Sequence, residues 1–266
     1  MNFTEKRMTE LLHELRNNHG AIAIKSDFEA ECTRMEEALR VRDLIASANL
    51  SLTVKIGGCE ALKDLFEAKC LGASRIVAPM IESPFALKKF AAAIPSLFSQ
   101  EEIADTQFFA NIESVTGFEK LDAILAEARI AKLDGVVMGR DDTAASLNLQ
   151  REDADSPLLE NIGRELVQKA TRQGLQAAIG GAVSTKTLGF FRTLPPNALN
   201  SYETRKVIFS ASNLSTPGVA EKALSLAAEF EILWLENKRA FYEVIAQEDN
   251  TRIKMMRERL SKLSLP

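Results

Sequence analysis

The stretch that decides the fold is residues 108–147, FFANIESVTGFEKLDAILAEARIAKLDGVVMGRDDTAASL. Residues 106–113 and 133–139 are mainly apolar runs of the length and composition of buried strands. Between them, Thr116 and Glu119 have the spacing of a capping box, which predicts the start of a helix. The stretch therefore reads as a strand, a helix and a second strand.

Acidic side chains follow both of these strands. Glu113 ends the first, and Asp141 and Asp142 come just after the second. The carboxyl ends of parallel strands form one working face, so these acids are expected to meet there. Carboxylate oxygens from separate strands suit Mg²⁺ or Mn²⁺, with water and substrate completing the coordination. One such acid alone is more simply a helix cap or a solvated loop residue, but the ordered pair favours a metal site.

The same alternation of strands and helices continues along the chain and predicts a (β/α)8 barrel of the TIM type, forming a single domain over residues 1–266. Strands are expected at residues 21–29, 50–56, 74–80, 106–113, 133–139, 175–179 and 203–209. Seven strands are one too few. Either a short strand lies between residues 17 and 20, or the barrel departs from the standard form, for example with a missing or atypical first strand.

Two further segments have expected places. Residues 150–157 are polar and predict a loop over the active face. Residues 217–266 exceed what closing a barrel needs and are expected to form a C-terminal helical extension with an apolar stripe. This extension packs between subunits of a homo-oligomer or folds over its own barrel.

Composition narrows the class of protein. The chain has 266 residues, of which 46% are hydrophobic, and a net charge of −4. It has no strong basic cluster, no apolar run of membrane-spanning length and a charged start, which argues against binding nucleic acid, membrane insertion and secretion. Three cysteines without metal-ligand spacing read as reduced thiols of a cytoplasmic protein.

Five short motifs, in order, resemble the HpcH/HpaI aldolase and citrate lyase β-subunit superfamily. They are DFEA at residues 27–30, VKI at 54–56, VAPMIES at 77–83, FANIESVTG at 109–117 and GRDDTAASL at 139–147. The resemblance implies a barrel in which Glu113 and Asp142 hold a divalent metal. It also implies a carbon–carbon lyase or aldolase that acts on a small 2-oxo acid, such as pyruvate, or a related carboxylate, through a metal-stabilised enolate.

The chain departs from the family pattern at two positions. Lys55 stands where the family has an arginine, and it is expected to bind the substrate and to balance the charge of the enolate. Ala30 stands where the aldolases have a catalytic histidine, although the citrate lyase branch also lacks it. Proton transfer is therefore expected from Glu29, with Lys25 or a metal-bound water as alternatives.

The turn after residue 139 supplies further candidates for the substrate site. Asp141 is expected to contact the substrate, and Arg140 to meet an anionic substrate or to form a surface salt bridge.

Three alternatives remain open. A Schiff-base aldolase would use Lys55 or Lys206 as the nucleophile. A lyase similar to citryl-CoA lyase would act on an acyl thioester. A barrel without catalysis, used for binding or assembly, is consistent with Ala30 and with the long C-terminal extension.

Overall fold

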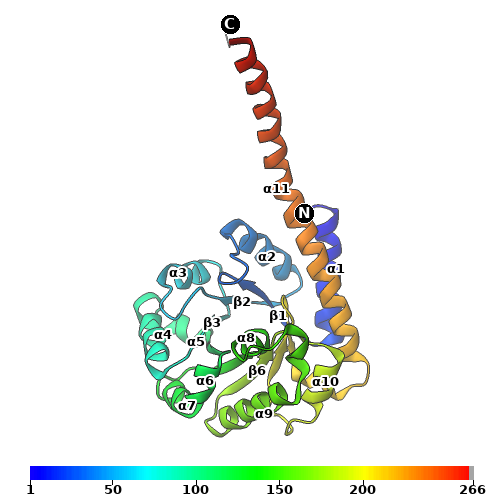
Figure 1. Ribbon diagram of the computed structural model, residues 1–266. Coiled ribbons are helices and arrows are strands. Elements are labelled where there is room, and N and C mark those ends of the chain that lie inside the picture. Colours follow the sequence, from blue (N-terminus) through cyan, green and yellow to red (C-terminus); the bar gives the residue numbers. More distant parts are fainter. Residues whose placement is uncertain (264–266) are drawn as a thin grey trace.

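A computed structural model describes residues 1–263 and shows a closed barrel of eight strands in chain order (Figure 1). The strands are β1 (Ala21–Asp27), β2 (Ser51–Lys55), β3 (Arg75–Ala78), β4 (Gln107–Ile112), β5 (Gly135–Gly139), β6 (Gln176–Gly180), β7 (Ser201–Glu203) and β8 (Val207–Ser210). The predicted α/β barrel of the TIM type is confirmed.

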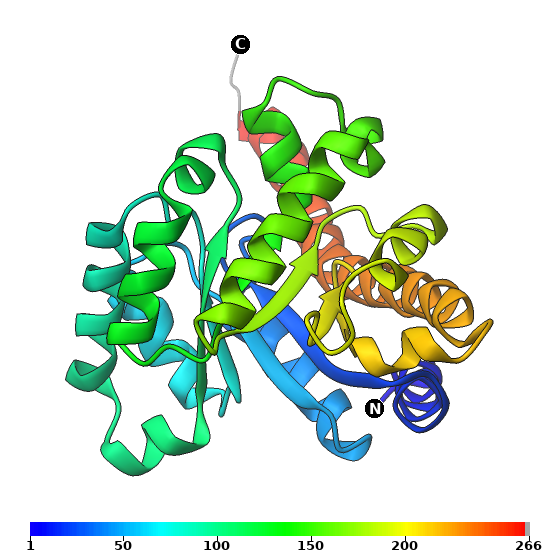
Figure 2. The same ribbon diagram turned by 90° about the horizontal axis from the view of Figure 1, so that it is seen from below.

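Helices surround the strands (Figure 2). They are α1 (Phe3–His19), α2 (Met35–Ser47), α3 (Leu62–Cys70), α4 (Pro84–Leu97), α5 (Gln100–Asp105), α6 (Val115–Glu119), α7 (Leu121–Ile130), α8 (Arg140–Ser146), α9 (Pro157–Arg172), α10 (Thr185–Arg192) and α11 (Val219–Leu263), with 3-10 turns η1 (Arg151–Asp155) and η2 (Ala211–Ser215). Among residues 1–263, none of these helices combines the length and the apolar character that crossing a membrane requires.

The unexpected strand is at the end of the barrel, not at its beginning. Residues 203–209, which read as one strand, form a hairpin in which β8 pairs antiparallel with both β7 and β1. Only three residues connect β7 and β8, whereas a parallel crossover needs a dozen or more. Residues 17–19 belong to α1, so the described chain has no strand before β1.

Apolar side chains pack on both sides of the barrel wall. Val77, Phe109, Val137 and Ala178 fill the interior, one from each of β3 to β6. The larger cluster lies between the strands and the surrounding helices. This alternation follows from the period of two along a strand, and it leaves the polar residues at the strand ends facing the barrel mouth.

The connection after β4 differs from the expected capping box. Ser114, not Thr116, caps α6, because its side chain accepts a hydrogen bond from the backbone N–H of Gly117. Helix α6 therefore begins at Val115, immediately after Glu113. The early start holds Glu113 in a tight strand-to-helix turn.

The C-terminal extension is confirmed as one helix, α11, of 45 residues. Its first half lies beside α1, and its second half projects beyond the barrel (Figure 1). Arg7 of α1 contacts Glu229 at 2.8 Å, and the buried side chain of Trp234 anchors the helix. From residue 243 to residue 263 every side chain is exposed. Residues 264–266 of the predicted extension lie outside the described part.

Candidate active site

A cavity of about 370 Å³ opens at the carboxyl ends of the strands. It is lined mainly by charged and small residues. The carboxylates are Asp27, Glu113, Asp141, Asp142, Glu203 and Glu231, and the cations are Lys25, Lys55, Arg151 and Arg205. These charged residues come from β1, β2, the position directly after β4, β7, the turn between β7 and β8, α8, η1 and α11, so the site depends on closure of the barrel.

Glu113 lies at the centre of this arrangement, with only 2% of its surface exposed. Its Oε1 accepts a hydrogen bond of 3.1 Å from the backbone N–H of Met80, whose φ of 51° is in the left-handed region. Its Oε2 accepts a hydrogen bond of 2.5 Å from the Asn111 side chain. Burial raises the pKa of Glu113, Lys55 opposes this rise, and the negative charge of Asp142 adds to it.

Gly139 makes room for this carboxylate. A Cβ atom on Gly139 would lie 2.2 Å from Oε2 of Glu113, closer than any real contact. In the register of the sheet, Ile112 pairs with Met138, so Glu113 and Gly139 are neighbours at the same level of the barrel mouth. The glycine at the end of β5 is thus required by the position of Glu113.

Asp141 and Asp142 lie in the first turn of α8, directly after β5, and both line the cavity. Asp142 lines the same cavity as Glu113, and its negative charge contributes to the raised pKa of Glu113. Oδ1 of Asp141 is buried and accepts no hydrogen bond from residues 1–263; Nε of Arg151 is 3.8 Å away. The strand exits therefore bring together the three acids that the sequence singled out.

Lys55, the last residue of β2, is buried between two carboxylates. Its Nζ lies 2.5 Å from Oε2 of Glu29 and 3.5 Å from Oε1 of Glu113. Burial alone would lower the pKa of Lys55, but Glu113 and Glu29 outweigh it and the pKa is raised. Lys55 is therefore a fixed cation at neutral pH.

A turn after β1 places Glu29 beside Lys55. Oδ1 of Asp27 accepts the backbone N–H groups of Glu29 at 3.0 Å and Ala30 at 2.9 Å. Ala30, which stands at the position where the resemblance implies a histidine in the aldolases, lines the cavity. The two histidines of the chain, His13 and His19, both lie on α1, away from the cavity lining.

The sequence does not predict a second ion pair on the cavity wall. Lys25 of β1 contacts Glu203 of β7 at 2.9 Å, and both residues line the cavity. Lys25 and Glu203 are 178 residues apart in the sequence, and the sequence predicts a single strand where β7 and β8 are separate. The sequence contains one indication of this pair: Lys25 is a charged residue within the mainly apolar strand β1.

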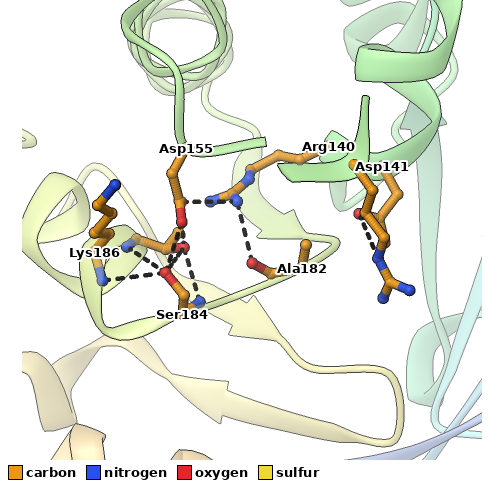
Figure 3. A network of polar contacts seen from close by, with 8 residues as sticks. Arg140, Asp141, Asp155, Ala182, Ser184 and Lys186 are labelled. Carbon is orange, nitrogen blue, oxygen red and sulfur yellow. Dashed lines mark hydrogen bonds and ion pairs between the residues drawn. The ribbon is translucent and has the colours of Figure 1, made fainter. Parts of the chain in front are cut away.

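Arg140 does not line the cavity, and neither does Glu29, which contacts it only through Lys55 at 2.5 Å. The side chain of Arg140 is 2% exposed and points into a network between three loops (Figure 3). Nη2 donates to Oδ1 of Asp155 at 3.0 Å and to the carbonyl oxygen of Ala182 at 3.3 Å. The expected surface salt bridge is thus a buried one, and the geometry gives Arg140 no direct contact with a molecule in the cavity.

The residues at the cavity fit a hard divalent cation. Glu113 and Asp142 offer carboxylate oxygens on adjacent strand exits, and Oδ1 of Asn111 is buried without a hydrogen-bond partner in residues 1–263. No three acidic, histidine or cysteine side chains converge within residues 1–263 as a complete metal cage. Mg²⁺ commonly uses only one or two carboxylates together with water and substrate, so two are sufficient.

The chain is similar to known proteins in sequence and in fold. The family model for HpcH/HpaI aldolase/citrate lyase matches residues 27–191, which include the candidate residues at positions 29, 55, 113, 141 and 142. The sequence has no significant match among curated proteins.

Solved structures with the same fold include three informative cases. An HpcH/HpaI aldolase/citrate lyase family protein from Burkholderia cenocepacia J2315 is 18% identical, with 90% of each chain covered and a TM-score of 0.62. An HpcH/HpaI aldolase from Desulfitobacterium hafniense DCB-2 is 15% identical, with 76% of this chain and 82% of that chain covered and a TM-score of 0.59. The citrate synthase SbnG is 14% identical, with 69% and 87% covered and a TM-score of 0.53. At these identities the likeness establishes the fold.

The family model spans more than half of the chain and includes both acids expected to hold the metal. Members of this family are aldolases and lyases, and its aldolases are generally dependent on a divalent metal. The resemblance seen in the five sequence motifs is confirmed, and the chain belongs to the HpcH/HpaI aldolase/citrate lyase family.

Proposed function

We propose that this protein is a divalent-metal-dependent carbon–carbon lyase or aldolase acting on a pyruvate-like 2-oxo acid. The observation that carries the proposal is the convergence of Glu113 and Asp142 on one cavity, with the cationic Nζ of Lys55 3.5 Å from Glu113. Mg²⁺ or Mn²⁺ held by these acids would supply Lewis acidity toward the carbonyl and carboxylate oxygens of the substrate.

The protein's own residues have distinct tasks in this proposal. Breaking or forming a bond next to a carbonyl group places negative charge on its oxygen, and Lys55 provides a nearby positive charge. Glu29 does not line the cavity, but it lies 2.5 Å from Nζ of Lys55, which does, and in this proposal Glu29 carries the proton in place of the absent histidine. We assign the substrate contact to Asp141, whose buried Oδ1 accepts no hydrogen bond from residues 1–263.

The geometry gives less support to the Schiff-base alternative. A lysine nucleophile must be neutral, but two carboxylates raise the pKa of Lys55. Burial lowers the pKa of Lys206, yet this side chain is ion-paired with Glu31, lies 6.0 Å from the Trp234 ring and does not line the cavity. Neither lysine combines a depressed pKa with a position in the site.

The proposal is tested by exchange of the methyl protons of pyruvate in D₂O, followed by NMR. Exchange is expected with Mg²⁺ or Mn²⁺ and is expected to stop after chelation, because enolate formation needs the metal. Exchange that persists with chelator, together with covalent trapping of pyruvate by borohydride, would instead establish the Schiff-base mechanism. If calorimetry detects no binding of Mn²⁺ or pyruvate, the result would favour the alternative that this protein is a barrel without catalytic activity.

The homo-oligomer expected from the sequence remains a proposal, supported by the projecting half of α11 with its exposed Ile253 and Met256. Sedimentation of the full chain is expected to give a mass above the 29.3 kDa of one chain. Replacing Ile253 and Met256 together by glutamate is expected to give a monomer, whereas Lys254→Glu on the same helix should leave assembly unchanged. A monomeric wild-type chain would refute the proposal.

A further inference from the structure

Two consecutive residues of α8 face different environments. Asp141 lines the cavity, whereas Arg140 points away from it and is almost completely buried (Figure 3). Burial lowers the pKa of Arg140, although Asp155 opposes this, and such a buried guanidinium is costly unless it is paired. The beginning of the helix that carries the cavity acids is therefore fixed by a contact outside the cavity.

Asp155 connects this arginine to a third segment. Its Oδ1 accepts hydrogen bonds from Arg140 at 3.0 Å and from the hydroxyl of Thr187 at 2.7 Å. Its Oδ2 accepts a hydrogen bond of 2.6 Å from the hydroxyl of Ser184, which also caps α10. One carboxylate thus links α8, the end of η1 and the start of α10.

The loop after β6 is pressed against the same helix start. A Cβ atom on Gly181 would lie 2.7 Å from the backbone nitrogen of Asp141, and Gly181 has a φ of 85° that glycine adopts without strain. The next residue, Ala182, has a φ of 42°, which is unfavourable for a residue with a Cβ. The carbonyl oxygen of Ala182 accepts the hydrogen bond from Arg140, so the network holds a strained loop against the acidic turn.

The cavity side of α8 has a matching contact. Arg151 at the start of η1 faces Asp141, while Asp155 at the end of η1 binds Arg140. Two ion pairs therefore connect α8 and η1: α8 supplies the arginine in one of them and the aspartate in the other. The buried pair lies behind the cavity, and the pair formed by the exposed Arg151 lies at its rim.

We propose that the network of Arg140, Asp155, Ser184 and Thr187 is a positioning device that fixes the acidic turn at residues 141–142 for metal binding. This inference rests on the metal site of the proposed function, but none of the four side chains is a ligand in it. Groups behind a metal ligand commonly change affinity or activity by about 10- to 100-fold when they are replaced.

The decisive measurement is the affinity of the full chain for Mn²⁺ by calorimetry, without substrate or turnover. Arg140→Met keeps most of the buried volume and removes the charge, and we expect its Kd for Mn²⁺ to rise by about 10- to 100-fold. Arg140→Lys keeps a cation beside Asp155 and is expected to recover most of the affinity. Arg192→Met is the matched control, because Arg192 binds Glu221 and the carbonyl oxygen of Leu214 outside the cavity.

Milder variants at the far end of the network extend the test, with Thr187→Val as the cleaner one, because Ser184→Ala also removes the cap of α10. Ser184→Ala and Thr187→Val each remove one hydrogen bond to Asp155 and are expected to weaken Mn²⁺ binding by a few-fold in the folded protein. Wild-type affinity in Arg140→Met, or an equal loss in Arg192→Met, would overturn the proposed positioning role. A wild-type protein that binds no Mn²⁺ would instead refute the proposed metal function itself, and this inference with it.

Discussion

Replacing Glu113 with glutamine is expected to abolish metal-dependent exchange of pyruvate protons, with a loss of at least about 10³-fold. The side chain keeps its size and its place above Gly139, but it loses the negative charge that a hard cation needs. A Lewis-acid contribution of several kcal/mol corresponds to a rate factor of this order. The measurement is the NMR exchange rate at saturating Mn²⁺, together with the Kd for Mn²⁺.

A second variant is expected to lose metal-dependent exchange of pyruvate protons for a steric reason. Gly139→Ala leaves the carboxylate chemically intact but places a Cβ atom where Oε2 of Glu113 lies, so Glu113 must move out of position. Glu127→Gln is the control, since Glu127 pairs with Lys88 on the outer helices. Wild-type exchange in Glu113→Gln would show that this carboxylate is not needed for the chemistry.

The acids of the site were predictable because they follow from local pattern and chain order. A run of apolar residues marks a strand, and an acid at its end lies at the barrel mouth whatever the exact boundaries. This pattern predicts Glu113, Asp141 and Asp142. Lys55 is predicted because a lysine in an apolar strand needs a polar surrounding, and the structure supplies two carboxylates.

The rest of the site depends on contacts between distant segments, and no single segment of the sequence predicts them. Arg140 and Asp141 are neighbours, and only the start of α8 at residue 140 turns one toward Asp155 and the other into the cavity. The pair of Lys25 and Glu203 forms only when the barrel closes. The hairpin of β7 and β8 looked like one strand because its three-residue turn lacks glycine, proline and asparagine, the usual turn signals.

Asp155→Ala is expected to lower the free energy of unfolding at pH 7 by about 3 kcal/mol, because it leaves the buried Arg140 without a counter-charge. The measurement is urea unfolding, with Asp153→Ala on the same turn as the control. Removal of Asp153 breaks only an exposed hydrogen bond to the backbone of Gln150, so a change below about 1 kcal/mol is expected there.

The pH dependence of this effect has a definite sign. Burial alone would raise the pKa of Asp155, but the hydrogen bonds from Ser184 and Thr187 and the charge of Arg140 outweigh it, so the pKa is lowered. A carboxylate whose pKa is depressed by folding stabilises the folded state above its unfolded pKa of about 3.9. This stabilisation is lost as the pH falls through the lower folded value. The difference between wild type and Asp155→Ala should therefore be constant near neutrality and shrink below about pH 4, whereas a difference that grows on acidification would contradict the assigned ion pair.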